Sequence, residues 1–218
     1  MYFDTNSPDA ARQLADALER LAVAARHSHW DAWAHAGLSA TQRLILQSLR
    51  APGEARSVKS LAALLGVSSP TVSDAVSALQ QKGLVERVAD AADARAKPVR
   101  LSRAGRALVD QLAQGADPLL QAAQSLAAAD QATMYRLVLQ LIRQLQASGH
   151  IATSRMCLHC RFFEPHAHAG ERPHHCHLVG EPLADRHLRL DCAEQQPADP
   201  DAQRVIWARF VQQPPQEI

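Results

Sequence analysis

The hydrophobic period of the chain changes between residues 69 and 101, and this change restricts the fold more than any other feature. The first part has the spacing of an amphipathic helix that ends at Gly83, with the apolar positions Val72, Ala75, Val76 and Leu79. The segments LVERV (84–88) and PVRLS (98–102) then alternate as strands do. This order predicts a helix followed by a β-hairpin.

A second, shorter helix is expected just before this one. Residues 58–65 have helical apolar spacing and stop at Gly66, while Ser68 or Ser69 can cap the next helix. Two short helices joined by a tight turn form a helix-turn-helix, whose second helix fits the major groove of DNA. The candidate DNA-binding residues lie on the polar face of the second helix and in the hairpin loop: Ser69, Thr71, Ser73, Asp74, Ser77, Gln81, Arg95 and Lys97.

The charge distribution agrees with a nucleic-acid partner. The chain has a net charge of only +1, but residues 43–106 hold eleven Lys and Arg against five Asp and Glu. This stretch, with an excess of six positive charges, contains the predicted helix-turn-helix and hairpin. A locally basic segment in a nearly neutral protein is typical of a phosphate-binding surface, although a solvated face has the same composition.

The rest of the chain is predicted to be mainly helical. Helical periodicity covers about residues 10–36, 40–50, 103–126 (with a kink at Pro118), 129–147 and 201–211. Composition shifts to Cys, His, Pro and Gly after Gly149, which suggests two domains. The first, residues 1–149, contains the DNA-binding core at 37–105. The second, residues 150–218, is a Cys/His-rich segment with a short terminal helix.

Two stretches of sequence resemble the MarR family of winged helix-turn-helix regulators. They are GVSSPTVSDAVSALQQKGLVERV (66–88) and DARAKPVRLSRAG (93–105), which includes the wing residues Asp93, Arg95, Ser102 and Gly105. The resemblance covers about residues 10–148. It implies a homodimer that binds a pseudo-palindromic operator in duplex DNA, with a small-molecule effector as a further candidate partner. Ser73 and Asp74 stand where relatives often have Arg or Lys, which leaves the operator sequence open.

The four cysteines form the second constellation. Cys157, Cys160, Cys176 and Cys192 follow the pattern C-x2-C-x15-C-x15-C, and no cysteine precedes them. A C-x2-C turn places two thiolates on one side of a bend, and the two later cysteines can complete a four-sulfur site. His175 or His177, beside Cys176, could replace one sulfur. In a reducing cytoplasm such clustering favours a metal over disulfides.

Zinc is the first expectation for this site, and an iron–sulfur cluster is the alternative. A redox-active pair at Cys157 and Cys160, or a loop without metal, are further readings. A segment with so few aliphatic residues is expected to need a metal to hold it together, so the small C-terminal unit is predicted to be metal-stabilised. The site could also be sensory, because it follows directly from the last long helix.

The expected function is therefore a dimeric DNA-binding transcriptional regulator rather than an enzyme. No nucleophile elbow, phosphate loop or supported carboxylate pair occurs in the sequence. The alternatives are a metal- or redox-active enzyme on a winged-helix scaffold and a protein-interaction adaptor. No apolar run is long enough for a membrane span and the N-terminus is polar, so a cytoplasmic protein without membrane contact is expected.

Overall fold

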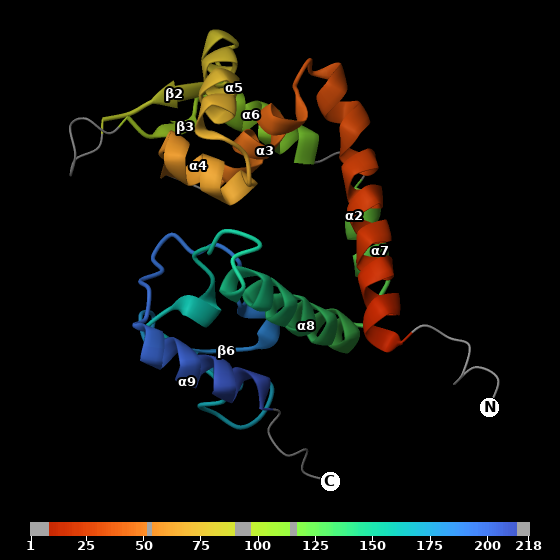
Figure 1. The fold of residues 1–218 in the computed structure, drawn as a ribbon, viewed down its shortest axis with the longest axis vertical. Helices are drawn as coiled ribbons and strands as arrows, with labels where there is room; N and C mark the ends of the chain where they lie inside the picture. Colours follow the sequence, from red (N-terminus) through yellow and green to blue (C-terminus); the bar gives the residue numbers. More distant parts are fainter. Residues whose placement is uncertain (1–8, 52–53, 90–96, 114–116, 213–218) are drawn as a thin grey trace, which may run out of the picture. The chain divides into compact units, whose positions relative to one another are not determined.

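Helices dominate the fold, as their apolar periodicity predicts. The computed structural model describes residues 9–51, 54–89, 97–113 and 117–212. Its α-helices are α2 (Ala10–His35), α3 (Ala40–Ser48), α4 (Val58–Leu65), α5 (Ser69–Gln81), α6 (Arg103–Ala113), α7 (Pro118–Gln124), α8 (Ala128–Ala147) and α9 (Pro200–Val211) (Figure 1).

Contacts divide the chain into two compact units. One consists of Met1–Leu61 with Ser69–Ser125, and the other of Ala62–Ser68 with Leu126–Ile218. In the described residues no single helix is long and apolar enough to cross a membrane. Helices α4 and α5 meet those limits only when they are joined across a bend of 114°. A bend of this size between two short helices is typical of a helix-turn-helix.

The predicted helix and hairpin are present in the first unit. Helix α5 buries Val72, Ala75, Val76 and Leu79 along one stripe. Strands β2 (Val85–Arg87) and β3 (Val99–Leu101) pair antiparallel, with Val85 opposite Leu101 (Figure 1). A short strand that the sequence did not predict, β1 (Ala55–Arg56), pairs with the other edge of β3. The wing is thus a three-stranded sheet in the order β1-β3-β2.

Strand β1 was not predicted because it is short and contains a buried charged residue, Arg56. Its Arg56 side chain is 9% exposed and pairs with Glu54 at 3.0 Å from Nε to Oε1. A two-residue strand with a charged buried side chain has neither the length nor the apolar alternation that marks a strand in sequence. The ion pair with Glu54 offsets part of the cost of burying the Arg56 charge.

The single kinked helix expected over 103–126 is wrong. The structure has two helices, α6 and α7, and the second begins with Asp117 as its N-cap. The Asp117 side chain accepts hydrogen bonds from the backbone N–H groups of Leu119 and Leu120. Pro118 takes the first helical position, where its missing N–H costs nothing. The Asp-Pro pair therefore starts a new helix instead of bending an old one.

The second unit joins α8 to the cysteine segment. That segment contains a 3₁₀ turn η1 (Cys157–His159), strands β4 (Phe163–Glu164), β5 (His174–Cys176) and β6 (Glu181–Leu183), and a second turn η2 (Asp185–His187). The strands form a sheet in the order β4-β5-β6. The apolar core is shared by α8, the cysteine segment and α9: Leu139, Met156, Leu158, Phe163, Leu188, Ala198, Ile206 and Phe210.

Composition predicts a domain boundary at residue 149, whereas the contacts group α8 with the residues that follow it. Leu139 of α8 is 1% exposed and belongs to the same core as Met156 and Leu158, which are fully buried. Tyr135 and Ile142 pack against that core from the same helix. Helix α8 thus packs against the cysteine segment and shares its apolar core.

Candidate DNA-binding surface and cysteine site

Helix α5 presents the polar face that the sequence predicts. Among the candidate residues, Ser69, Thr71, Asp74, Ser77 and Gln81 are exposed, and Ser73 is half-buried. The Ser77 hydroxyl donates to the Ser73 carbonyl at 2.9 Å, so its oxygen is left to accept from an outside donor. The small side chains on this face allow close approach of a partner to the helix.

The base of the hairpin adds positive charge beside α5. Lys97 is exposed, and its carbonyl accepts a hydrogen bond from Arg87 Nη1 at 3.4 Å. Arg87 also donates to Gln80 of α5 at 3.3 Å, which links the hairpin to the helix. Arg95, the other predicted wing residue, lies outside the described residues. Arg87 was not among the residues predicted from the sequence. The signal that could have identified it is a basic residue in the strand that precedes the hairpin loop.

Ser102 and Gly105 fix the helix that follows the hairpin. The Ser102 hydroxyl donates to the Gly83 carbonyl at 2.6 Å and accepts from the Gly105 N–H at 3.0 Å. Ser102 is thus the N-cap of α6. A Cβ atom at Gly105 would lie 1.9 Å from the carbonyl oxygen of Leu84. Only glycine permits this approach, which holds α6 against the start of β2.

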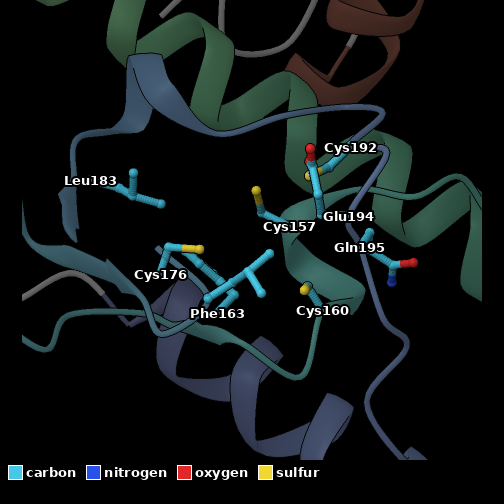
Figure 2. Close-up of a pocket in the computed structure, with 9 residues that line it drawn as sticks. Cys157, Cys160, Phe163, Cys176, Leu183, Cys192, Glu194 and Gln195 are labelled. Carbon is cyan, nitrogen blue, oxygen red and sulfur yellow. The ribbon is translucent and has the colours of Figure 1, made fainter. Parts of the chain in front are cut away.

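The structure brings all four cysteines to one pocket. Cys157, Cys160, Cys176 and Cys192 line it together with Phe163, Leu178, Leu183, Glu194 and Gln195 (Figure 2). None of the four is exposed, none is fully buried, and all are free thiols. Residues up to 35 positions apart in sequence are therefore gathered at one place, as the sequence pattern predicts for a shared ligand.

Backbone hydrogen bonds position the cysteine pair in η1. The Cys160 N–H donates to the Cys157 carbonyl at 2.9 Å, which closes the tight turn of the C-x2-C motif. The Cys157 N–H donates to the Arg189 carbonyl at 3.1 Å, and the Arg189 N–H donates in return to the Cys157 sulfur at 3.3 Å. Cys157 is thus locked to the segment that leads to Cys192.

The other two cysteines are held by separate elements. Cys176 ends β5, where it pairs with Phe163 on one side and Glu181 on the other. The Cys192 N–H donates to the Arg155 carbonyl at 2.8 Å. An ion pair of 2.7 Å between Arg155 and Asp191 fixes the same two segments. Each thiol therefore enters the pocket from an ordered piece of backbone.

Burial raises the pKa of two of the thiols, Cys157 and Cys192. It raises the pKa of Cys157 to about 11, in spite of the hydrogen bond from Arg189 and with a smaller contribution from the three neighbouring cysteines. Burial also raises the pKa of Cys192, whose thiol donates to Glu194 at 3.3 Å. The three other thiols act on Cys157 electrostatically, so each of them lies near Cys157.

The predicted substitute ligands face away from the pocket. Neither His175 nor His177 is among its lining residues. Side chains alternate along β5, so Cys176 and His174 share one face and His175 the other. His177 Nε2 lies 2.8 Å from Glu164 Oε2, and His175 Nδ1 lies 3.0 Å from His168 Nε2. The histidines thus form a cluster of their own on the opposite side of the strand.

Helix α8 contacts the cysteine site through hydrogen bonds that the sequence did not reveal. The Tyr135 hydroxyl donates to the Leu188 carbonyl at 2.8 Å, one residue before the Arg189 amide that binds Cys157. Gln146 Oε1 lies 2.7 Å from His159 Nε2, inside the C-x2-C turn. Burial lowers the pKa of His159, which favours its neutral ring. No local motif marks these two contacts, because Leu188 and His159 lie 53 and 13 residues from Tyr135 and Gln146, respectively.

The four sulfurs do not converge as ligands of a single ion. In the described part of the chain, no three His, Cys, Asp or Glu side chains are arranged to hold one metal ion. Figure 2 shows the sulfurs placed around the pocket rather than meeting at a point. The space that the lining residues enclose is about 330 Å³, including the part open to solvent.

Several solved structures of transcriptional regulators are similar to this chain. The transcriptional regulator PA3341 is 25% identical over 62% of this chain and 98% of its own, with a TM-score of 0.55. E. coli MarR is 23% identical over 62% and 97%, with a TM-score of 0.47. S. aureus MepR, solved as a mutant bound to an oligodeoxyribonucleotide, is 21% identical over 61% and 98%, with a TM-score of 0.42. No curated protein matches the chain significantly.

The family match agrees with the geometry of the helices and the hairpin. The sequence model of the MarR family matches residues 36–96, which include α3, α4, α5 and β2. The match ends before the first cysteine. Residues 36–96 are therefore similar in sequence to the MarR family.

Proposed function

We propose that this chain is a transcriptional regulator that binds duplex DNA as a homodimer, with α5 in the major groove and the wing against the flanking backbone. The observation that carries the proposal is α5 itself. It buries one apolar stripe and presents small polar side chains on the other face, inside the segment that matches the MarR family. Such a regulator acts in the cytoplasm, where its DNA lies.

The candidate residues have distinct roles in this proposal. Thr71, Ser77 and Gln81 can reach base edges, because they are exposed along one side of α5. Asp74 is suited to accept from a cytosine amine, since a carboxylate repels phosphate. Ser69 and Ser73 are assigned to phosphate oxygens near the start of the helix, and Lys97 with Arg95 to the backbone beside the wing. A small-molecule effector stays a prediction.

Binding of the full-length protein to its own promoter region should exceed binding to random duplex, and should weaken as salt rises. Replacing Lys97 by alanine is expected to lower the slope of log K against log salt by about two for the dimer, because each subunit loses one phosphate contact. Fluorescence anisotropy over a salt series measures this slope. Arg172→Ala, at an exposed position in the second unit, is the matched control. Equal affinity for promoter and random DNA would contradict the proposal.

An exposed apolar stripe on α8 supports the homodimer. Met134, Leu137, Leu141 and Leu145 recur at helical spacing and are between 37% and 48% exposed. A soluble chain seldom leaves such a row uncovered, and burial against a second copy would remove it from water. Two winged units held in this way would bind a pseudo-palindromic site.

The variant Leu137→Glu is therefore expected to be monomeric, and its affinity for a two-half-site operator to fall by about 100-fold because the second contact is no longer intramolecular. Sedimentation velocity gives the oligomeric state and anisotropy the affinity. Val205→Glu, which changes a 57% exposed valine on α9, should remain dimeric. A wild-type monomer that still binds the operator tightly would contradict the dimer.

We further infer that the four cysteines bind a metal centre, either zinc or an iron–sulfur cluster. Their common pocket and the electrostatic proximity of their thiols support this role. A bound cation would also stabilise the thiolates that burial otherwise disfavours. The centre has a structural role in holding the segment. A sensory role is supported by the hydrogen bonds from Tyr135 and Arg189, which connect Cys157 to α8.

A further inference from the structure

The arrangement of the four sulfurs distinguishes between the two metal centres. They surround a space of about 330 Å³ that is partly open to solvent, instead of pointing at one position (Figure 2). Within the residues that the structure describes, no set of three ligand side chains could hold one ion. The four thiols thus lie around a shared space rather than about one point.

A single zinc ion requires a closer set of ligands. Each thiolate of a tetrahedral zinc site lies about 2.3 Å from the ion, so that neighbouring sulfurs are ~4 Å apart. Reaching this geometry here would mean moving Cys157, Cys176 and Cys192 towards one another. Their backbones are tied to Arg189, to the β4-β5-β6 sheet and to Arg155, respectively. These ties hold the backbone, so a closer set of sulfurs would require the side chains to rotate.

We propose that this pocket holds an iron–sulfur cluster, ligated by Cys157, Cys160, Cys176 and Cys192. The inference rests on the proposed metal centre and specifies its chemistry. In such a cluster each cysteine thiolate binds one of several iron atoms, and inorganic sulfide lies between the iron atoms. The four thiols release their protons on ligation. A site whose sulfurs are spread around a cavity fits this group.

The remaining pocket wall suits a cluster. Phe163, Leu178 and Leu183 supply its apolar lining, and Phe163 is only 4% exposed. Apolar side chains limit the access of water and oxidants to iron and sulfide. The Arg189 N–H donates to the Cys157 sulfur, a type of hydrogen bond that stabilises the electron-rich sulfur of a cluster ligand. Leu178, which is 44% exposed, marks the open side.

Metal analysis of the full-length protein tests the proposal. The protein is purified without oxygen from cells supplied with both iron and zinc, and iron, zinc and acid-labile sulfide are measured per chain. We expect iron and sulfide in equal amounts, about two to four per chain, with broad visible absorption. One zinc per chain without sulfide would overturn the proposal, and so would a folded protein that contains neither metal.

DNA binding on the same samples separates this inference from the proposed function. Zinc-loaded or metal-free protein that still prefers its promoter would overturn the cluster and leave the regulator standing. A protein with a full cluster and no preference for the promoter would overturn the regulator and leave the cluster standing.

A pair of neighbouring variants tests the ligands. Cys176→Ser is expected to lower both iron and sulfide about ten-fold or more, since it removes a direct ligand. His175→Ala changes the adjacent residue, which faces the opposite side of β5, and should keep the wild-type content. Retention of the full cluster by Cys176→Ser would overturn four-cysteine ligation. Circular dichroism confirms that each variant is folded, and the wild-type metal content is a test that needs no variant.

Discussion

Replacing Gly105 by alanine is expected to destabilise the winged-helix unit by about 3 kcal/mol, at the upper end of the cost of overpacking. The added methyl group would lie 1.9 Å from the Leu84 oxygen and 2.9 Å from its carbonyl carbon. Both atoms belong to the backbone, so no side-chain rotation can relieve the clash. Helix α6 must move away from the start of β2, which disturbs the hydrogen bonds of its N-cap Ser102.

Hydrogen exchange of the full-length protein measures this loss within the unit itself. Amides of α5 and α6 should exchange about 100-fold faster in Gly105→Ala, because each 1.4 kcal/mol changes an opening equilibrium ten-fold. Ala107→Ser adds one atom at an exposed position of the same helix and should change the free energy by no more than about 0.5 kcal/mol. Equal protection in the two variants would mean that α6 does not approach Leu84 this closely.

Gly105 also illustrates what the sequence could predict. The winged helix is built from local patterns: the apolar stripe of α5, the alternation at Val99 and Leu101, and the glycines that end helices. Each pattern operates within a few residues, so the order of helices and hairpin follows from reading along the chain. The reason for Gly105 is a contact with Leu84, 21 residues earlier, and that contact appears only in the structure.

Polar and charged contacts explain where sequence reasoning failed. Strand β1 exists because Arg56 pairs with Glu54 and because β3 offers a free edge. The break before α7 depends on the Asp117 side chain capping a new helix. A pattern of apolar positions contains neither fact, since a polar cap and a buried ion pair are exceptions to the rule that buried means apolar.

For the cysteine segment, the sequence predicted the common site but not the apolar core. The spacing of Cys157, Cys160, Cys176 and Cys192 indicated a common site, and the structure places all four in one pocket. Composition alone suggested a segment too poor in aliphatic residues to form a core. In the structure it completes its core with Leu139 of α8 and with Ile206 and Phe210 of α9. A metal centre would add to the stability that this core provides. The composition had instead suggested that a metal would take the place of an apolar core.

Phe210→Ala is expected to be the most destabilising of the core substitutions in the second unit, at about 4 kcal/mol. The Phe210 side chain is fully buried. Its ring centroid lies 6.2 Å from that of Phe163 and 5.6 Å from that of His174, so it joins α9 to both β4 and β5. Removing the ring leaves a cavity between these elements. Since Phe163 lines the cysteine pocket, the pocket wall loses its support as well.

Val205→Ala provides the matched comparison, because Val205 lies on the same helix but is 57% exposed. It should change stability by no more than about 0.5 kcal/mol. Both variants are compared with wild type at equal metal content, since a bound metal stabilises the folded unit by mass action. Faster hydrogen exchange in α8 and β5 for Phe210→Ala alone would establish α9 as a structural part of the cysteine site. The same small effect in both variants would instead mean that α9 is a peripheral helix, and that the pocket depends on α8 and its own sheet.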